Sequence, residues 1–332
     1  GESAAGNAFG GKVGPGQTAR IFTGAPVPKG ADAIVMQEDT EVAGDQITMT
    51  VAPWPGKFVR PAGLDFQLGD VGITANRVLS SRDVGLAAAM NVPWLTVARR
   101  PRIALLATGD EIVRPGEPVG PNQIISSNTI ALMGLIKASG GEAIDLGIAS
   151  DDEASLRALA AGARGADMLV TLGGASVGDH DLVRKVLGQD GLELDFWRIA
   201  MRPGKPLIFG SIGETPMMGM PGNPVSSLVC GIVYLRPAVR AMLGLDPHAA
   251  SQTARLGQDL PGNDLRQDYL RATASLNEDG ETVVTPFDKQ DSSMLSRLAK
   301  ADCLILRAPH ADPAKAGERV EILPLSGETT GI

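Results

Sequence analysis

The feature that most restricts the fold is an alternation of strand-like and helix-like patterns between residues 101 and 247. Repeated strand–helix units of this length predict an α/β domain, with a mostly parallel sheet and helices on both faces. Strands are expected at 103–107, 143–148, 168–172, 194–199, 206–210 and 216–220, and helices at 128–137, from 151 onwards, at 181–187 and at 226–243. In such sheets, ligands bind at the carboxyl ends of the strands.

Short β patterns dominate on both sides of this block. Residues 1–60 suggest a small β barrel or sandwich, and residues 61–100 are mixed. Residues 248–332 are again rich in β patterns, so the chain is expected to have four parts with these boundaries. The expected elements outside the α/β block are strands at 19–23, 33–37, 46–51, 94–98, 267–275, 281–286, 303–307 and 319–323, and a helix at 81–90 with Ser80 or Ser81 as its N-cap.

Charge and composition exclude several classes of protein. The chain has 30 basic and 38 acidic residues, a net charge of −8, which argues against a general nucleic-acid binder. The longest apolar run without a charge or proline, at 225–235, has 11 residues, whereas a membrane span needs about 20. Cys230 and Cys303 suggest neither a disulfide framework nor a zinc site, which fits a cytoplasmic protein. The chain begins with Gly1 rather than methionine, so a fragment or processed form is expected.

Two carboxylates follow the first buried strand of the α/β block, in the sequence Thr108-Gly109-Asp110-Glu111. Carboxylates at the carboxyl end of a strand can meet a ligand or hold a hard cation through oxygen. The alternative is that they cap a turn or a helix.

A glycine-rich stretch, TLGGASVGDHD, links the strand at 168–172 to the next helix. Glycines let backbone N–H groups turn towards an anion, and a helix N-terminus favours negative charge. Ala175 stands where the dinucleotide fingerprint needs its second glycine, so that motif is not matched. A tight strand-to-helix turn is the structural alternative.

The same stretch contains a G-x-S-x-G pattern centred on Ser176, which raises the rival hypothesis of a serine hydrolase. A triad in that fold needs a later acid followed by a later histidine. His180 is too close in sequence, while His248 and His310 lie in proline-rich loops, so the pattern disfavours a hydrolase.

Two further loops combine proline and glycine with polar residues. In residues 198–206, Arg198, Arg202 and Lys205 lie on an open loop that can present cations to phosphate. In residues 219–227, GMPGNPVSS precedes the last long helix and suits an anion at its N-terminus, although a simple N-cap is compatible with the same residues. With the separated carboxylates Glu111, Asp151, Asp179 and Asp181, these loops predict an enzyme that handles a phosphorylated anion with Mg²⁺.

Six strings along the chain resemble the MoeA family, the molybdopterin molybdenumtransferases, and the homologous E domain of gephyrin. The strings are IFTGAPVPKGADAIVMQE (Ile21 to Glu38), LATGDEI, GIASDDEASLR, TLGGASVGDHD, MRPGKP and GMPGNPVSS. The resemblance implies that residues 1–60 are most of an inserted β domain, 61–100 half of a mixed domain, 101–247 a MogA-like α/β domain and 248–332 a C-terminal β-barrel. It also implies a homodimer and a MogA-like adenylyltransferase as pathway partner.

The resemblance implies a reaction in which molybdate enters adenylylated molybdopterin and AMP is released in a Mg²⁺-dependent cleavage. By similarity, the catalytic residues are Glu111, Asp151, Asp181, Arg198, Arg202 and Lys205, of which the three acids are the metal ligands. By the same similarity, the substrate-binding residues are Thr23, Asp65, Gly173, Gly174, Ser176, Pro221, Gly222, Asn223, Arg266 and Ser292.

The sequence departs from the family pattern at two points. Arg198 and Arg202 replace lysines found in some members, which keeps the charge but changes the geometry of the donors. An SAMDGYA-like motif found upstream in the family is absent, so weakened activity and a weakened dimer are expected of this polypeptide. Two other functions remain as alternatives: a non-catalytic anchoring module similar to the gephyrin E domain, and a MogA-like adenylyltransferase.

Overall fold

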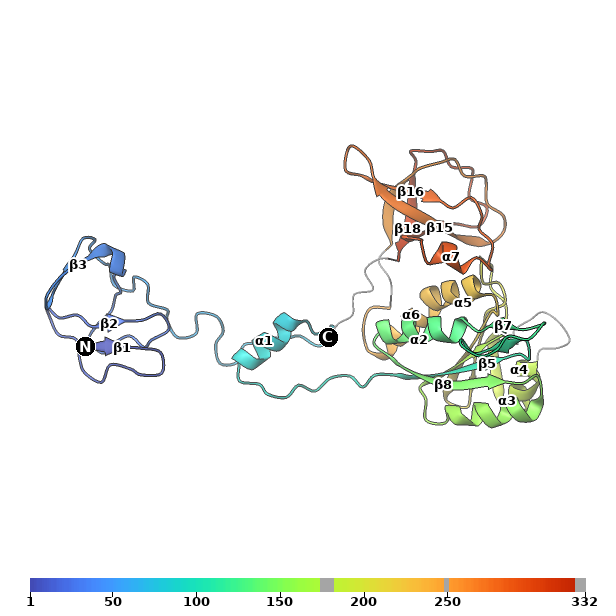
Figure 1. The fold of residues 1–332 in the computed structure, drawn as a ribbon, viewed down its shortest axis with the longest axis horizontal. Coiled ribbons are helices and arrows are strands. Elements are labelled where there is room, and N and C mark those ends of the chain that lie inside the picture. Colours follow the sequence, from blue (N-terminus) through green and yellow to red (C-terminus); the bar gives the residue numbers. More distant parts are fainter. Residues whose placement is uncertain (174–181, 248–250, 326–332) are drawn as a thin grey trace. The chain divides into compact units, whose positions relative to one another are not determined.

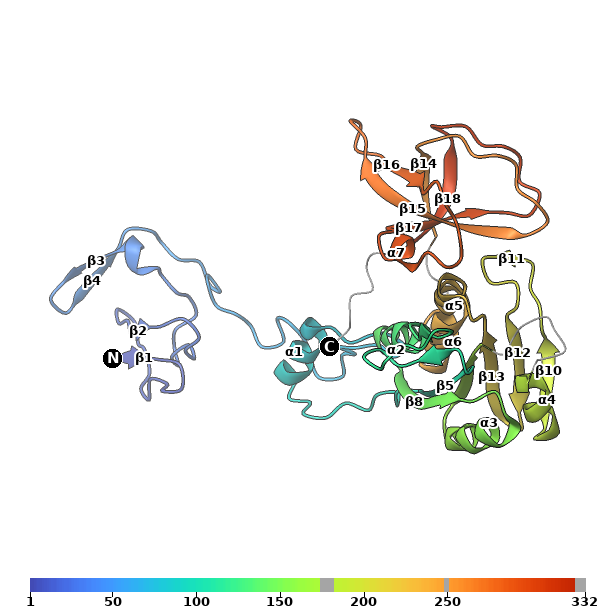
Figure 2. The same ribbon diagram turned by 45° about the vertical axis from the view of Figure 1, so that its right-hand side comes forward.

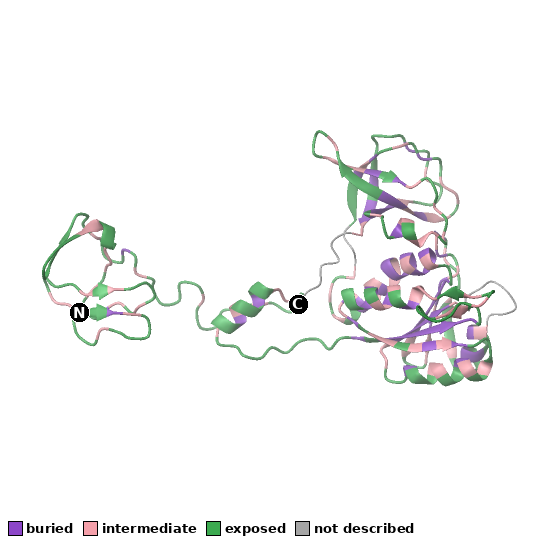
Figure 3. Ribbon diagram, in the orientation of Figure 1, coloured by how far each residue is buried: buried purple, intermediate pink, exposed green. Residues whose placement is uncertain are grey.

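A computed structural model describes residues 1–173, 182–247 and 251–325. The chain forms two compact units, Gly1–Ile73 and Thr74–Ile332. Most of the buried residues belong to the second unit, where the α/β domain and a β-barrel lie (Figures 1 and 3).

The first unit contains two separate two-stranded ladders. Its elements are β1 (Glu2–Ser3), β2 (Arg20–Ile21), the 3₁₀ turn η1 (Gln37–Asp39), β3 (Thr40–Ala43) and β4 (Gln46–Met49). The strand expected at 33–37 is wrong, because this segment forms no ladder: the Ile34 N–H donates to the Lys57 carbonyl at 2.9 Å, and η1 follows. The unit therefore has fewer strand pairs than the expected barrel or sandwich.

Helix α1 (Ser81–Ala89) opens the second unit, and Ser80 is its N-cap. The Ser80 and Asp83 side chains each accept a hydrogen bond from the other residue's backbone N–H, which forms a capping box. The strand expected at 94–98 is wrong, because this segment pairs with no strand in the described part of the chain.

The α/β domain is built on a six-stranded sheet in the order β10-β12-β13-β9-β5-β8. The four strands from β13 to β8 are parallel, and β10 and β12 are antiparallel at one edge. The prediction of a mostly parallel sheet is confirmed. Its strands are β5 (Arg102–Thr108), β8 (Glu142–Ala149), β9 (Met168–Leu172), β10 (Leu192–Phe196), β12 (Ile208–Ile212) and β13 (Thr215–Met220), with a small ladder of β6 (Ile112–Val113) and β7 (Ile124–Ile125) beside it.

Both faces of this sheet are covered by helices, as Figures 1 and 2 show. Helices α2 (Asn128–Ala138) and α5 (Pro224–Cys230) cover one face, and α3 (Glu153–Ala160), followed by the turn η2 (Ala161–Ala163), and α4 (Leu182–Gln189) cover the other. The central strand β5 explains the arrangement. Ile103 and Leu105 pack into the first core and Ala104 and Leu106 into the second, because successive side chains of a strand point to opposite faces.

The long helix expected at 226–243 is interrupted. It consists of α5, a π turn η3 (Gly231–Leu235) and α6 (Arg236–Met242). A Cβ on Gly231 would lie 2.6 Å from Leu132 Cδ2, so glycine permits close packing against α2. Pro237 has no N–H to give to the helix, which a π turn accommodates.

By length and composition alone, Pro224–Met242 could span a membrane. About half of this segment is buried in the protein, and Val225, Val229 and Leu235 belong to the hydrophobic core on one face of the sheet.

The C-terminal part is a closed five-stranded barrel, with pairings β15–β16–β14–β18–β17 and back to β15. The short strand β11 (Met201–Arg202) leaves the α/β domain and pairs in parallel with β15. The barrel elements are β14 (Gln252–Leu256), β15 (Gln267–Leu276), β16 (Thr282–Pro286), α7 (Leu295–Leu298), β17 (Cys303–Arg307) and β18 (Arg319–Pro324).

Both cysteines are buried, so we expect neither to react in the native protein. Burial raises the pKa of Cys230 to about 12, and burial together with Asp302 raises the pKa of Cys303 to about 11. At pH 8 almost no thiolate forms at either site. A thiol titration with Ellman's reagent should detect no rapidly reacting group in native protein and two in guanidinium chloride. A native thiol that reacts as fast as free cysteine would contradict this packing.

Candidate functional site

The carboxyl ends of β5 and β8 bring acidic side chains together. The Asp151 N–H donates to Asp110 Oδ1 at 3.2 Å, and the Asp110 N–H donates to Asp151 Oδ2 at 3.4 Å. Gly109 has φ +130°, and a Cβ there would lie 2.2 Å from Glu111 Oε2, so the glycine lets the Glu111 carboxylate fold over the turn. Glu111 and Asp151 are both exposed, as a ligand site requires.

Gly173, directly after β9, and Gly222, after β13, lie close to each other beside this turn. The Gly173 N–H donates to the Met220 carbonyl at 3.3 Å, and a Cβ on Gly222 would lie 3.9 Å from Gly173 Cα. Gly173 has φ +87°, and a Cβ there would lie 3.0 Å from the Thr108 carbonyl oxygen. Asn128 at the start of α2 donates to the Gly222 carbonyl at 2.7 Å. Two of the predicted glycines therefore lie together at the carboxyl edge of the sheet.

The barrel contributes Ser292 to the start of α5. Asn223 Nδ2 lies 3.1 Å from Ser292 Oγ, and the Val225 N–H donates to the Ser292 carbonyl at 3.1 Å. Pro221 is buried in the same loop. Ser292, Asn223 and Gly222, predicted from segments about 70 residues apart, are brought together.

The loop that carries Ser292 is held by Arg271, a residue that the sequence analysis missed. Arg271 is only 1% exposed, and burial lowers its pKa. Its Nε donates to Gln290 Oε1 at 3.0 Å and its Nη1 to the Asp291 carbonyl at 2.8 Å. An arginine in a strand gives no local signal of burial, so only the tertiary structure reveals this role.

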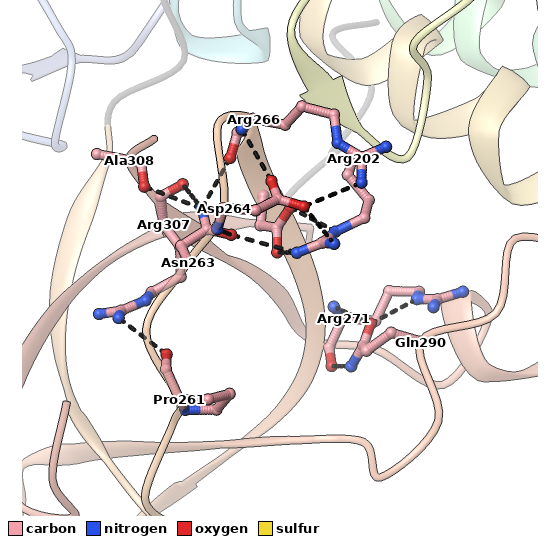
Figure 4. A network of polar contacts seen from close by, with 10 residues as sticks. Arg202, Pro261, Asn263, Asp264, Arg266, Arg271, Gln290, Arg307 and Ala308 are labelled. Atoms are coloured by element: carbon pink, nitrogen blue, oxygen red, sulfur yellow. Dashed lines mark hydrogen bonds and ion pairs between the residues drawn. The ribbon is translucent and has the colours of Figure 1, made fainter. Parts of the chain in front are cut away.

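The Arg202 guanidinium forms hydrogen bonds and ion pairs with residues of the barrel (Figure 4). Its Nε donates to Asp268 Oδ1 at 2.7 Å, and its Nη2 contacts the other oxygen of Asp268. Its Nη1 donates to Asp264 Oδ2 at 3.0 Å, and Asn263 Oδ1 also accepts from Nη2 at 3.2 Å. Arg266 shares Asp264 with Arg202. These contacts raise the pKa of Arg202, chiefly through Asp268. No motif in the sequence marks Asp264 or Asp268 as a partner of this cation.

The other two predicted cations are exposed. The Arg198 guanidinium stacks 4.0 Å above the Trp197 ring. The Lys205 ammonium makes no hydrogen bond or ion pair with any residue that the structure describes, so its charge is available to an anion. The turn before Lys205 packs closely on α5, where a Cβ on Gly204 would lie 2.5 Å from Cys230 Sγ. Glycine is therefore required at this position, which also has φ +119°.

Several predicted residues cannot be placed in this arrangement. Gly174, Ser176 and Asp181 lie outside the described residues, as do Asp179, His180 and His248. Thr23 and Asp65 are exposed residues of the first unit, which is described separately. Among the described residues, no group of three or more His, Cys, Asp or Glu side chains could hold a metal ion by itself.

Comparison with known proteins accounts for nearly the whole chain. Three family models match in succession: MoeA N-terminal region (domain I and II) at residues 1–91, probable molybdopterin binding domain at 104–241 and MoeA C-terminal region (domain IV) at 253–325. A molybdopterin molybdenumtransferase from Haemophilus influenzae is 34% identical over 98% of this chain and 81% of its own length. The chain belongs to the MoeA family.

Other MoeA proteins support the assignment. The crystal structure of the molybdopterin biosynthesis MoeA protein from Pyrococcus horikoshii matches with a TM-score of 0.82 and 31% identity, over 98% of this chain and 80% of that one. A molybdopterin molybdenumtransferase from Nostoc is 39% identical over 70% of this chain, and that match spans 54% of the relative's length. The resemblance to the MoeA family is therefore confirmed, as is the expected fold with a mostly parallel sheet and a C-terminal β-barrel.

Proposed function

We propose that this MoeA protein is a molybdopterin molybdenumtransferase, an enzyme of molybdenum cofactor biosynthesis that joins molybdate to adenylylated molybdopterin and releases AMP. The observation that carries the proposal is the carboxyl edge of the sheet. There the Gly173 and Gly222 loops, the carboxylates of Asp110 and Asp151, and Ser292 of the barrel adjoin one another. Glycine loops before helices suit phosphates, and the relatives' names supply the substrate class.

The cations of the proposed site have separate roles. Lys205 and Arg198 lie exposed on the loop between β10 and β12, where they can offset the charge of molybdate or of the pyrophosphate. Arg202 and Arg266 both donate to Asp264 of the barrel, and Ser292 and Asn223 supply neutral hydrogen-bonding groups. The site residues outside the described part, Gly174, Ser176 and Asp181, and also Thr23 and Asp65, remain part of the proposal.

The carboxylates fit a Mg²⁺ ion bound together with substrate. Mg²⁺ in nucleotide enzymes commonly takes one or two carboxylates, with phosphate oxygens and water completing its shell. Asp110 and Asp151 each accept a hydrogen bond from the other's backbone N–H at the ends of β5 and β8, Glu111 follows Asp110, and Asp181 is a fourth candidate by sequence. When bound, Mg²⁺ would neutralise charge on the pyrophosphate link and so assist its cleavage.

The barrel favours this function over that of a MogA-like adenylyltransferase, because Ser292, Arg266 and Asp268 would be superfluous to an enzyme made of the α/β domain alone. The same proposal includes a homodimer, a cytoplasmic location and a MogA-like adenylyltransferase as supplier of the substrate. It also includes four domains, with boundaries at residues 60, 100 and 247. It includes no nucleic-acid or membrane partner.

The proposed function is tested by incubating the protein with adenylylated molybdopterin, Mg²⁺ and molybdate and following AMP by chromatography. AMP should appear at a rate that depends on both Mg²⁺ and molybdate. AMP release at a rate independent of molybdate would indicate a simple hydrolase. If neither this chain nor a longer form carrying the upstream motif released AMP, the proposal would be refuted.

An Asp151→Asn variant should need more Mg²⁺ for the same rate. Removing one carboxylate from the ion's surroundings commonly weakens metal affinity by about 10-fold or more. The apparent Mg²⁺ constant for AMP release measures this, and Glu193→Gln, an exposed carboxylate on the edge strand β10, is the matched control. If both variants had the wild-type Mg²⁺ requirement, Asp151 would not be a ligand.

A further inference from the structure

Arg202 lies where the α/β domain and the barrel are joined by backbone pairing. Strand β11 runs parallel to β15 with Arg202 in register with Asp268, and the Gln267 N–H donates to the Ala200 carbonyl at 3.0 Å. The Asp268 side chain is only 6% exposed, whereas that of Arg202 is 45% exposed. A buried carboxylate therefore holds a guanidinium whose outer part reaches solvent.

The Arg202–Asp268 contact uses one edge of the guanidinium. Nε and Nη2 contact the two Asp268 oxygens, a fork geometry that fixes the plane of the group. The remaining Nη1 donates to Asp264 Oδ2 at 3.0 Å, and the same oxygen accepts from Arg266 Nη2 at 3.1 Å. Two guanidinium groups thus converge on a single carboxylate oxygen (Figure 4).

The two carboxylates differ in their surroundings. Asp268 is buried beneath Arg202, while Asp264 is 40% exposed at the side chain and lies in the turn before β15. Asp264 is anchored by the Arg266 N–H, which donates to its Oδ1 at 2.9 Å. Arg202 and Arg266 share the other oxygen of Asp264, Oδ2. An external oxyanion can therefore replace Oδ2 between the two guanidinium groups.

We propose that Asp268 is a positioning residue that aims Arg202 at an oxyanion site shared with Arg266, and that Asp264 occupies this site until the substrate anion replaces it. The proposal rests on the proposed function for the identity of the anion, a tetrahedral oxyanion supplied either by molybdate or by a phosphate of adenylylated molybdopterin. No covalent step is involved. Asp264 and Asp268 therefore act in opposite directions on anion binding.

The experiment compares Asp268→Asn with Asp264→Asn, in AMP release and in direct binding of molybdate by calorimetry. Asp268→Asn should raise KM for the anion about 10-fold with kcat changed less than about 2-fold, since a misaligned guanidinium loses a charge-assisted hydrogen bond. Asp264→Asn should lower the same KM about 3-fold, because it removes a competing charge while its amide oxygen can still accept from the Arg266 N–H. If KM for molybdate moves, molybdate takes the site, and if only KM for the adenylylated substrate moves, a phosphate takes it.

A second pair in the same barrel supplies the control. Arg255 Nε and Nη2 donate to the two oxygens of Glu281 at 3.0 and 3.1 Å, in the same fork geometry but between β14 and the start of β16. Glu281→Gln should leave both KM values unchanged. If Asp268→Asn fails to fold, Arg202→Lys, which keeps the charge and loses the fork, should reproduce the rise in KM.

The proposal would be overturned if Asp268→Asn and Asp264→Asn changed KM for the anion in the same direction, or if neither changed it. A purely structural network would weaken anion binding in both variants. Absence of AMP release from both the wild-type chain and the longer form carrying the upstream motif would refute the proposed function but not this inference, because the molybdate and phosphate dissociation constants of the variants still test it. Wild-type protein that binds neither molybdate nor phosphate would overturn the inference.

Discussion

Replacing Gly204 by alanine should destabilise the second unit by about 3 kcal/mol, because the change combines a disfavoured backbone conformation with a clash in the core. Gly204 has φ +119°, a region that L side chains rarely adopt, and the new Cβ would lie 2.5 Å from Cys230 Sγ and 3.0 Å from Met201 Sδ. Cys230 and Met201 are both buried, so neither can move aside without disturbing α5 or β11. The loop that carries Arg202 and Lys205 should therefore shift as well.

Urea unfolding of Gly204→Ala, followed by circular dichroism, measures this loss. Gly134→Ala is the matched control, since Gly134 is exposed within α2 and a Cβ there would meet nothing within 4 Å. It should stabilise the protein by up to about 1 kcal/mol through helix propensity. If Gly204→Ala unfolded at the wild-type urea concentration, the packing of the loop on α5 would be wrong.

Replacing Lys205 by alanine should lower kcat/KM for AMP release by about 100-fold or more, the usual effect of removing one group that stabilises developing negative charge. The physical reason is that the Lys205 ammonium has no carboxylate partner among the described residues, so its charge is left for a ligand. For the same reason, its loss should change the free energy of unfolding by less than about 0.5 kcal/mol.

Steady-state kinetics and urea unfolding of Lys205→Ala test the two halves of this expectation. Lys300→Ala, an exposed lysine of the barrel, is the control and should keep wild-type kinetics. Lys205→Arg should retain part of the activity because the charge remains while the donor geometry changes. A Lys205→Ala enzyme within 2-fold of wild type would exclude Lys205 from the site.

The parts of the fold that the sequence predicted correctly are those with a strong local signal. The buried strand at 103–107 is apolar on both faces, and helices in the α/β domain begin at recognisable caps such as Asp152. The π turn at Gly231–Leu235 could not be predicted, because it depends on packing against Leu132 and Leu135 of α2. The strands expected at 33–37 and 94–98 have suitable residues but no partner strand, and a strand exists only through pairing.

The site shows the same division between local and tertiary information. Glycine-rich turns after strands predicted that Gly173 and Gly222 lie at the carboxyl edge of the sheet, and both do. The partners of Arg202 lie 62 and 66 residues later in the chain, so no local pattern indicates that carboxylates bind this cation. The sequence predicts that Arg202 is presented to an anion, and the structure adds that it links the α/β domain to the barrel.

We expect one site of this protein to couple the release of AMP to the uptake of molybdenum. The most direct measurement is the stoichiometry of the two products in a single reaction with adenylylated molybdopterin, Mg²⁺ and molybdate, with AMP measured by chromatography and molybdenum bound to the dithiolene by mass spectrometry. If a single site couples the two events, AMP and the molybdenum-containing product should form in equal amounts at every time point. AMP formed without molybdenum incorporation, or molybdenum incorporation without AMP, would contradict it.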